Sequence, residues 1–234
     1  MLLMQHIKEV QPYYKMLLET ELFSKVFEED MPQLLHCLHA RVKNYSADSF
    51  IIHAEDSSDE FGVVLQGSVH IITEDMFGNR SITAHLNEGE LFGQIATTRS
   101  FITSPASVIA VSEEVSIMFL KFSSLVAPCT RACSFHSLVI ENMMNVLAKR
   151  NLLMNQKLAI LSQRTMREKL LAFLYLQYKE IGSNEFDIPF NRDELADFLC
   201  VNRSALSREI AKMVDEELIE TTRSHFILNE HTFL

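Results

Sequence analysis

The stretch NRDELADFLCVNRSALSREIAKMVDEELIE, residues 191–220, decides the fold of the C-terminal part of this chain. Asn191 and Glu194 form an N-x-x-E pair, a variant of the capping box that begins a helix. Asn202 follows a tight connection and is well suited to cap a second helix. The apolar residues of that second helix recur at spacings of four and three, which places them on one buried face: Leu206, Ile210 and Met213. The stretch therefore predicts two helices joined by a short turn.

A different face of the second helix carries the polar residues Arg203, Ser204, Ser207 and Arg208. Arginine pairs bidentately with guanine O6 and N7, and serine bonds to base edges or to phosphate. The alternative is a solvated amphipathic helix with two arginines. The capped first helix, the tight turn and the strands that follow favour a DNA reader. We predict that these four residues contact DNA together with Asn202, and that Arg192 on the first helix holds a phosphate.

The segments around this pair of helices complete a compact unit over residues 162–234. A helix over Met166–Glu180 ends at a Gly-Ser pair, and a short strand follows over Phe186–Phe190. Two further runs, Leu218–Thr222 and Phe226–Leu228, predict a terminal β-hairpin. Three helices followed by a hairpin are typical of a winged helix-turn-helix.

The first half of the chain has a different texture. Two short amphipathic helices are predicted between Pro12 and Arg41, where glycine is absent. Five of the six glycines then fall between Val42 and Phe122 and separate short strand-like runs. The predicted strands are 50–52, 61–65, 69–73, 81–85, 107–111 and 115–120. Many short strands with glycine turns predict an antiparallel jelly roll, a double-stranded β-helix, within a sensing domain over residues 1–133.

Residues 134–161 lack glycine and proline and predict one helix about 42 Å long. Its apolar residues surround the helix broadly, so it must contact both its own domain and a second surface. The simplest second surface is the same helix of another copy, which makes 134–161 a dimerisation helix in a homodimer. The alternative is a helix buried within one domain.

The composition limits where the protein acts and what it binds. The formal net charge is −10 and 47 % of the residues are hydrophobic. The longest apolar runs are far shorter than a membrane span, and the N-terminus resembles no signal peptide, so we expect a cytoplasmic protein without a membrane partner. The negative net charge argues against broad affinity for nucleic acid. The positive charges near Arg203 and Arg208 form a local patch, which can still bind DNA.

The motif R-D-E-L-A-D-F-L-C-V-N-R-S-A-L-S-R, residues 192–208, closely resembles that of the Crp/Fnr family, the catabolite activator and fumarate-nitrate regulators. The resemblance extends over nearly the whole chain. It implies an α+β fold with a cyclic-nucleotide-binding-like jelly roll, a dimer on a palindromic double-stranded operator, and RNA polymerase as a partner. It also implies Arg208 as the guanine contact and Arg203 as a base or phosphate contact. Two residues depart from the family pattern. Cys200 replaces a glycine, so we expect a slightly altered turn, and Ser204 replaces a base-reading glutamate, so the family's half-site cannot be transferred.

The segment GELFGQIATTRSFITSPASVIA, residues 89–110, resembles the phosphate-binding cassette of cyclic-nucleotide sensors. Gln94 stands where the family's ribose-binding glutamate would be, and Ser104 stands where its phosphate-binding arginine would be. A buried phosphate without a cation keeps its desolvation cost. We therefore expect a small effector other than cyclic AMP, with an atypical cyclic-nucleotide pocket as the alternative. The expected pocket residues, with one from the long helix, are Gly89, Glu90, Phe92, Gly93, Gln94, Ser104, Ala106 and Met143.

Cys129 and Cys133 are four residues apart, and His136 follows three residues later. On a helix this spacing could bring two thiols and an imidazole together as metal ligands or as a redox switch. The alternative is two ordinary buried thiols, because four-ligand patterns are far more specific.

An enzyme is the competing class of function. A cupin-type β-barrel enzyme needs an H-x-H metal set, whereas His53, His70 and His85 are single. The sequence contains no P-loop, no G-x-G-x-x-G and no G-x-S-x-G. We therefore predict a non-enzymatic regulator. A nucleotide-binding module that does not bind DNA is a further alternative, which the helix-turn-helix argues against.

Overall fold

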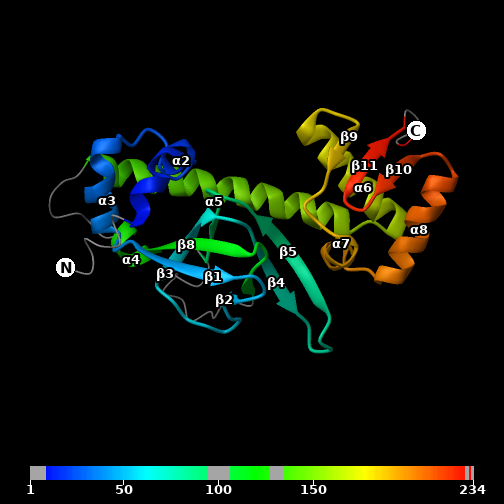
Figure 1. Ribbon diagram of the computed structural model, residues 1–234, viewed down its shortest axis with the longest axis horizontal. Helices are drawn as coiled ribbons and strands as arrows, with labels where there is room; N and C mark the ends of the chain where they lie inside the picture. Colours follow the sequence, from blue (N-terminus) through cyan, green and yellow to red (C-terminus); the bar gives the residue numbers. More distant parts are fainter. Residues whose placement is uncertain (1–8, 94–105, 127–133, 230–231, 233–234) are drawn as a thin grey trace. The chain divides into compact units, whose positions relative to one another are not determined.

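The computed structural model describes residues 9–93, 106–126, 134–229 and 232. The chain divides into two compact units. The β-roll unit comprises Met1–Thr73 and Thr83–Arg150, and the helix-turn-helix unit comprises Glu74–Ile82 and Asn151–Leu234. The helix α5, Ser134–Leu161, has 28 residues and contributes to both units (Figure 1).

Within the described residues, the β-roll is built from two four-stranded sheets with the strand orders β1-β8-β3-β6 and β2-β7-β4-β5. The pairs β1–β8, β3–β8, β3–β6, β2–β7 and β4–β7 are all antiparallel. This arrangement confirms the predicted antiparallel jelly roll. The strands are β1 Arg41–Ser46, β2 Phe50–Ile52, β3 Glu60–Gln66, β4 Val69–Glu74, β5 Arg80–Leu86, β6 Leu91–Phe92, β7 Ser107–Ala110 and β8 Glu114–Lys121.

The central strand β3 is buried on both faces, which explains its continuous apolar sequence FGVVL. Val64 belongs to a hydrophobic cluster shared by the two sheets, with Phe92 and Phe119 in edge-to-face contact at 6.3 Å. Its neighbours Val63 and Leu65 belong to a second cluster, which packs against helices. Because side chains alternate along a strand, one strand supplies both cores.

The helices of the β-roll unit cover the second cluster. They are η1 Gln11–Tyr13, α2 Tyr14–Glu19, η2 Glu28–Asp30, α3 Met31–Cys37 and α4 Phe122–Val126, together with the first half of α5. Val139 and Met143 of α5 are buried in this cluster. The amide of Asn142 donates to the carbonyls of Leu22 and Ser24, at 3.0 and 2.8 Å, and so fixes the loop after α2.

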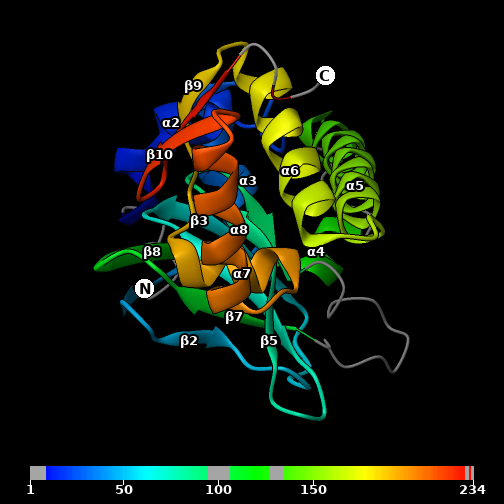
Figure 2. The same cartoon turned by 90° about the vertical axis from the view of Figure 1, so that its right-hand side faces the viewer.

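The helix-turn-helix unit contains α6 Met166–Ile181, β9 Glu185–Asp187, α7 Arg192–Leu199, α8 Arg203–Asp215, β10 Ile219–Thr222 and β11 His225–Leu228. Its strands form a sheet in the order β10-β11-β9, and α6 lies beside α8 (Figure 2). The predicted winged helix-turn-helix is confirmed. A capping box at Thr165 and Glu168 begins α6, and Gly182 ends it in the left-handed conformation.

In the described part of the chain, the structure adds two strands, β1 and β6, and the short helix α4, none of which was predicted from the sequence. It also moves the predicted strand 186–190 to β9, where Pro189 lies outside the ladder. The predicted helix 134–161 is found with the same bounds as α5. The strands β1 and β6 were missed because RVKNYS carries two cations and LF is only two residues long.

Candidate nucleic-acid interface

The first helix of the motif, α7, begins at the predicted capping box. The Oδ1 of Asn191 accepts from the backbone N–H groups of Asp193 and Glu194, at 2.9 and 3.0 Å. The Oε2 of Glu194 accepts in return from the N–H of Asn191 at 2.8 Å. Leu195, Ala196 and Leu199 are buried, so the cap and the apolar face together fix how α7 lies in its unit.

The turn after α7 keeps a left-handed backbone although a cysteine occupies it. Cys200 has φ 54° and ψ 51°, and its N–H donates to the carbonyl of Ala196. This conformation favours glycine, and a side chain with a Cβ costs roughly 1–2 kcal/mol there. The departure from the family pattern at this position therefore retains the conformation that a glycine would adopt, at a cost in stability.

The second helix, α8, is capped by Asn202, whose Oδ1 accepts from the N–H groups of Ser204 and Ala205 at 3.0 and 3.3 Å. The Ser204 hydroxyl donates to the same oxygen at 2.6 Å. Both predicted contact residues thus have a local structural task. Ser204 can still accept a hydrogen bond from a base or a phosphate donor.

The predicted reading residues lie on the exposed side of α8. Leu206, Ile210 and Met213 are buried on the inner side. The Nε of Arg208 donates to the carbonyl of Ser204 at 3.3 Å, one turn earlier on the helix. The structure brings together one exposed surface that contains Arg203, Ser204, Ser207 and Arg208.

An arginine of α6 fixes the position of α8. The Nε of Arg167 donates to Glu209 at 2.6 Å, and its two terminal nitrogens donate to Glu216 at 2.6 and 2.9 Å. These bonds from Arg167 hold the pKa of the Glu216 carboxyl below its usual value. Because Glu209 lies in α8 and Glu216 is its C-cap, one guanidinium ties two points of the helix to α6.

Arg192, predicted to hold a phosphate, points beneath the β10–β11 hairpin. Its Nη2 donates to the Thr221 hydroxyl at 2.7 Å, and its guanidinium carbon lies 4.9 Å from the ring centroid of Phe226. Burial lowers the pKa of Arg192. In this conformation Arg192 links the start of α7 to the hairpin, so its predicted phosphate contact stays a prediction that needs a change of rotamer.

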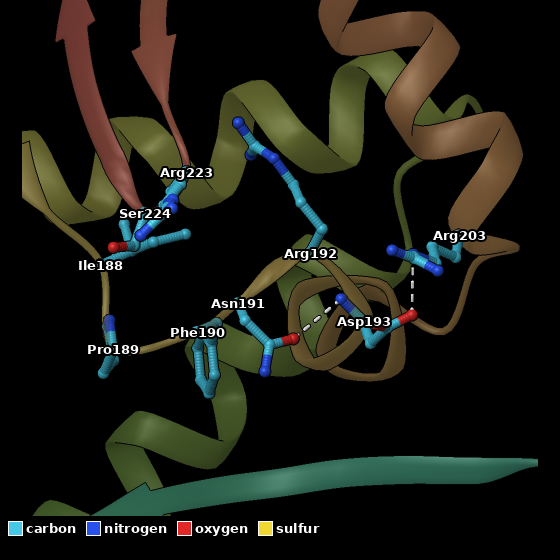
Figure 3. A pocket seen from close by; sticks show the side chains of 9 residues that line it. All are labelled: Ile188, Pro189, Phe190, Asn191, Arg192, Asp193, Arg203, Arg223 and Ser224. Atoms are coloured by element: carbon cyan, nitrogen blue, oxygen red, sulfur yellow. Dashed lines mark hydrogen bonds and ion pairs between the residues drawn. The ribbon is translucent and has the colours of Figure 1, made fainter.

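An open hollow of about 580 Å³ adjoins the start of α7 (Figure 3). Its lining includes three arginines, namely Arg192, Arg203 and Arg223, together with one acid, Asp193. The Nε of Arg203 lies 2.8 Å from the Oδ1 of Asp193. The positive excess favours an anion such as a DNA phosphate.

The predicted effector residues are not gathered into one described pocket. Gln94 and Ser104 lie outside the described residues. Phe92 is fully buried between the two sheets, whereas Met143 lies in the other hydrophobic cluster. The carboxylate of Glu90 accepts from the N–H of Asn87 at 2.7 Å and so closes the turn before β6. The predicted residues Gly89 and Gly93 both have positive φ, and Ala106 packs against the core between the sheets.

The predicted metal or redox site falls mostly outside the described residues, because Cys129 and Cys133 are not among them. His136 is buried, and its Nε2 lies 2.9 Å from the carbonyl oxygen of Ser124. Within the described residues, no group of three or more His, Cys, Asp or Glu side chains could hold a metal ion. No helix in the same part of the chain is long and apolar enough to cross a membrane.

Three residues that bind or line this surface were not predicted from the sequence, namely Asp193, Arg167 and Arg223. Asp193 appeared only as a residue of the first helical turn, where acids are common. Arg167 lies far from α8 in sequence, and Arg223 occupies the hairpin turn with φ 55°. The several arginines around the motif could have indicated Arg223. Nothing in the sequence indicated the contacts of Asp193 and Arg167.

Comparisons with known proteins agree with this geometry. Residues 42–129 match the family model of the cyclic nucleotide-binding domain, and residues 168–233 match that of the Crp-like helix-turn-helix domain. The chain is 35 % identical over 68 residues to the cAMP-activated global transcriptional regulator Vfr of Pseudomonas aeruginosa. That alignment covers 27 % of this chain and only 32 % of the length of Vfr.

Two solved structures share the fold at low sequence identity. The c-di-GMP responsive global regulator CLP of Xanthomonas campestris has a TM-score of 0.69 and 17 % identity, over 82 % of this chain and 95 % of that one. FixK2 of Bradyrhizobium japonicum has a TM-score of 0.63 and 18 % identity, over 82 % and 94 % of the two chains. With a cyclic nucleotide-binding domain and a Crp-like helix-turn-helix domain in one chain, the protein belongs to the Crp/Fnr family.

Proposed function

We propose that this protein reads a palindromic DNA operator as a homodimer under the control of a small effector other than cyclic AMP. The observation that carries the proposal is the exposed face of α8, which presents Arg203, Ser207 and Arg208 beside a buried apolar face. An α-helix fits the major groove, where arginine recognises guanine. Two such helices in a dimer would contact half-sites about 34 Å apart.

The proposed dimer forms through α5. In the single chain this helix exposes large apolar side chains along its length: Ile140, Met144, Leu147, Leu152, Leu153, Met154 and Leu158. Exposed apolar surface of this extent on one helix is typical of a protein interface. A second copy of α5 would cover it in the symmetric way that most homodimers use.

The proposal about the effector rests on the sequence of the cassette. Gln94 and Ser104 replace the carboxylate and the guanidinium that would bind the ribose and the phosphate of cyclic AMP. A cyclic nucleotide in an atypical pocket is the second candidate, supported by the match to the cyclic nucleotide-binding domain. Isothermal titration of the full chain with cyclic AMP should show no micromolar binding, and a micromolar dissociation constant would favour the second candidate.

The proposed mechanism is a shift between two arrangements of the dimer. An effector that binds one packing of the α5 helices more tightly would change the separation of the two α8 helices. Only this difference in affinity can drive the shift. On DNA the dimer would act in the cytoplasm, with RNA polymerase as its partner in transcription.

The direct test is Arg208→Ala in a DNA-binding assay with the duplex that the wild-type chain enriches from a randomised pool. Loss of a bidentate base contact should cost about 1–3 kcal/mol of specific binding and relax the preference at one base pair. Lys179→Ala removes the same charge from the end of α6 and is the matched control. Equal behaviour of the two variants would show that α8 does not read the sequence.

A further inference from the structure

The ion pair between Arg203 and Asp193 engages only one side of the guanidinium. The contact runs from Nε to Oδ1 at 2.8 Å, and the two side chains are 64 % and 62 % exposed. Among the described residues, Arg203 has no other ion pair or hydrogen bond. Its two terminal nitrogens are therefore free and form the planar fork that recognises guanine or phosphate bidentately.

Asp193 is itself held in place by the cap of α7. Its backbone N–H donates to the Oδ1 of Asn191 at 2.9 Å, within the reciprocal capping box that Asn191 forms with Glu194. Only the short side chain of Asp193 has rotational freedom. A short carboxylate side chain on the fixed backbone of α7 therefore contacts a long, flexible side chain at the start of α8, at the edge of the hollow that both residues line (Figure 3).

We propose that Asp193 is a positioning residue that determines the sequence specificity of DNA binding. By holding Nε, it orders Arg203 before DNA arrives and leaves the terminal fork directed at a base pair. Ordering a side chain in advance removes part of the entropy cost of binding. The inference rests on the proposed reading of DNA by α8.

The negative charge of Asp193 should also weaken the unspecific binding of DNA. A carboxylate beside Arg192, Arg203 and Arg223 opposes the approach of any phosphate backbone, whatever its sequence. Specificity is a difference of two affinities, and it grows when unspecific binding is weakened. Asp193 thus strengthens the correct contact and weakens the unspecific ones.

An acid in the first turn of a helix also stabilises that helix through the helix dipole. If this were the only task of Asp193, its replacement would lower the stability of the protein without changing the discrimination between DNA sequences. The two tasks therefore differ in an observable other than stability.

The experiment compares two probes with the full chain, namely the duplex that the wild type enriches from a randomised pool and a scrambled duplex of the same composition. For Asp193→Ala we expect tighter binding to the scrambled duplex, unchanged or weaker binding to the enriched one, and a specificity ratio reduced by about fivefold, the upper range for an exposed ion pair. Asp193→Asn keeps an oxygen acceptor for Nε, so it should retain more of the discrimination. Thermal unfolding confirms that each variant is folded.

Asp215→Ala is the matched control, because it removes the same charge at the far end of α8 and should leave the ratio unchanged. In the background of Arg203→Ala, the additional change Asp193→Ala should not reduce the ratio further, since the two residues act through one contact. A ratio for Asp193→Ala equal to that of Asp215→Ala would overturn the inference. If Arg208→Ala still lowers specific binding in that case, the proposed function stands. If the wild type enriches no sequence, both are overturned.

Discussion

The two units of this chain use polar side chains in different ways. In the β-roll unit, apolar clusters fill the space between the sheets and beneath the helices, and the buried polar side chains among the described residues there are His70, His136 and Asn142. In the helix-turn-helix unit, the helices that would face DNA are fixed by caps and ion pairs at the surface: Asn191, Asn202, Arg167 with Glu209 and Glu216, and Arg203 with Asp193.

This difference separates stability from function. Apolar burial contributes most of the folding free energy, and salt does not screen it as it screens an attraction between charges. Exposed ion pairs contribute little to stability and are screened by salt, but they determine where a side chain points. We therefore expect changes in the β-roll core to unfold the protein and changes in the surface pairs to alter DNA recognition.

The largest effect on stability is expected from Gly62→Ala in the β-roll core. A Cβ at this position would overlap the ring of Phe92, which pairs with Gly62 across the β3–β6 ladder. Overpacking of this kind should destabilise the protein by about 3 kcal/mol. Chemical denaturation followed by circular dichroism measures the loss.

Gly78→Ala is the control for this variant, because a Cβ there meets no atom within 4 Å and only the positive φ of 78° opposes it. That strain should cost about 1 kcal/mol. Equal losses for the two variants would contradict the close packing of Phe92 on Gly62.

A smaller effect on stability is expected from Lys157→Met. Lys157 differs from the surface ion pairs of the helix-turn-helix unit because its amine is largely buried. Lys157 lies on the C-terminal part of α5, its Nζ is 3.7 Å from the ring centroid of Phe198, and it donates to the carbonyl of Ile82. Burial lowers the pKa of Lys157 from 10.5 to about 8. The folded protein therefore disfavours the charged amine, and this cost applies in full below pH 8.

As the pH rises from about 8 to 10.5, the unfolded chain binds more protons at Lys157 than the folded one, so this group makes the folded state more stable with rising pH. Over that range the free energy of unfolding of the wild type should rise by about 2 kcal/mol relative to that of Lys157→Met. This value allows for the attraction between the charged amine and the ring of Phe198, which is lost when the amine becomes neutral. Denaturation of both proteins at several pH values tests this. A constant difference between them would show that Lys157 is not buried as described.

The smallest effect is expected at the turn between α7 and α8. Cys200→Gly removes the strain of the left-handed backbone but gives the unfolded chain more conformational freedom. The free energy of unfolding should therefore rise by a net amount of about 0.5 kcal/mol. Cys200→Ala keeps the Cβ and should show no gain, which separates backbone strain from the loss of the thiol. Thermal unfolding measures both. A gain for alanine equal to that for glycine would point to the thiol.

Much of the fold was predictable from the sequence. The capping residues Asn191 and Asn202 are where the sequence placed them, because a cap depends only on neighbours within one turn. The bounds of α5 were also predicted as found, within a longer stretch that lacks glycine and proline. The strands β1 and β6 were not predictable, since their place in the sheet depends on pairing with β8 and β3, which are far away in sequence.

The amino-acid sequence by itself thus determined which faces are apolar, where the helices of the reading motif begin, and that Arg203 and Arg208 share an exposed side of α8. Only the tertiary structure decided the partners of those residues. It placed Asp193 against Arg203, Arg167 against one acid of α8 and the acid that follows α8 as its C-cap, and Arg192 beneath the hairpin. The physical reason is range: periodicity and capping act within a few residues, whereas an ion pair between elements exists only once the packing of their apolar faces has brought them together.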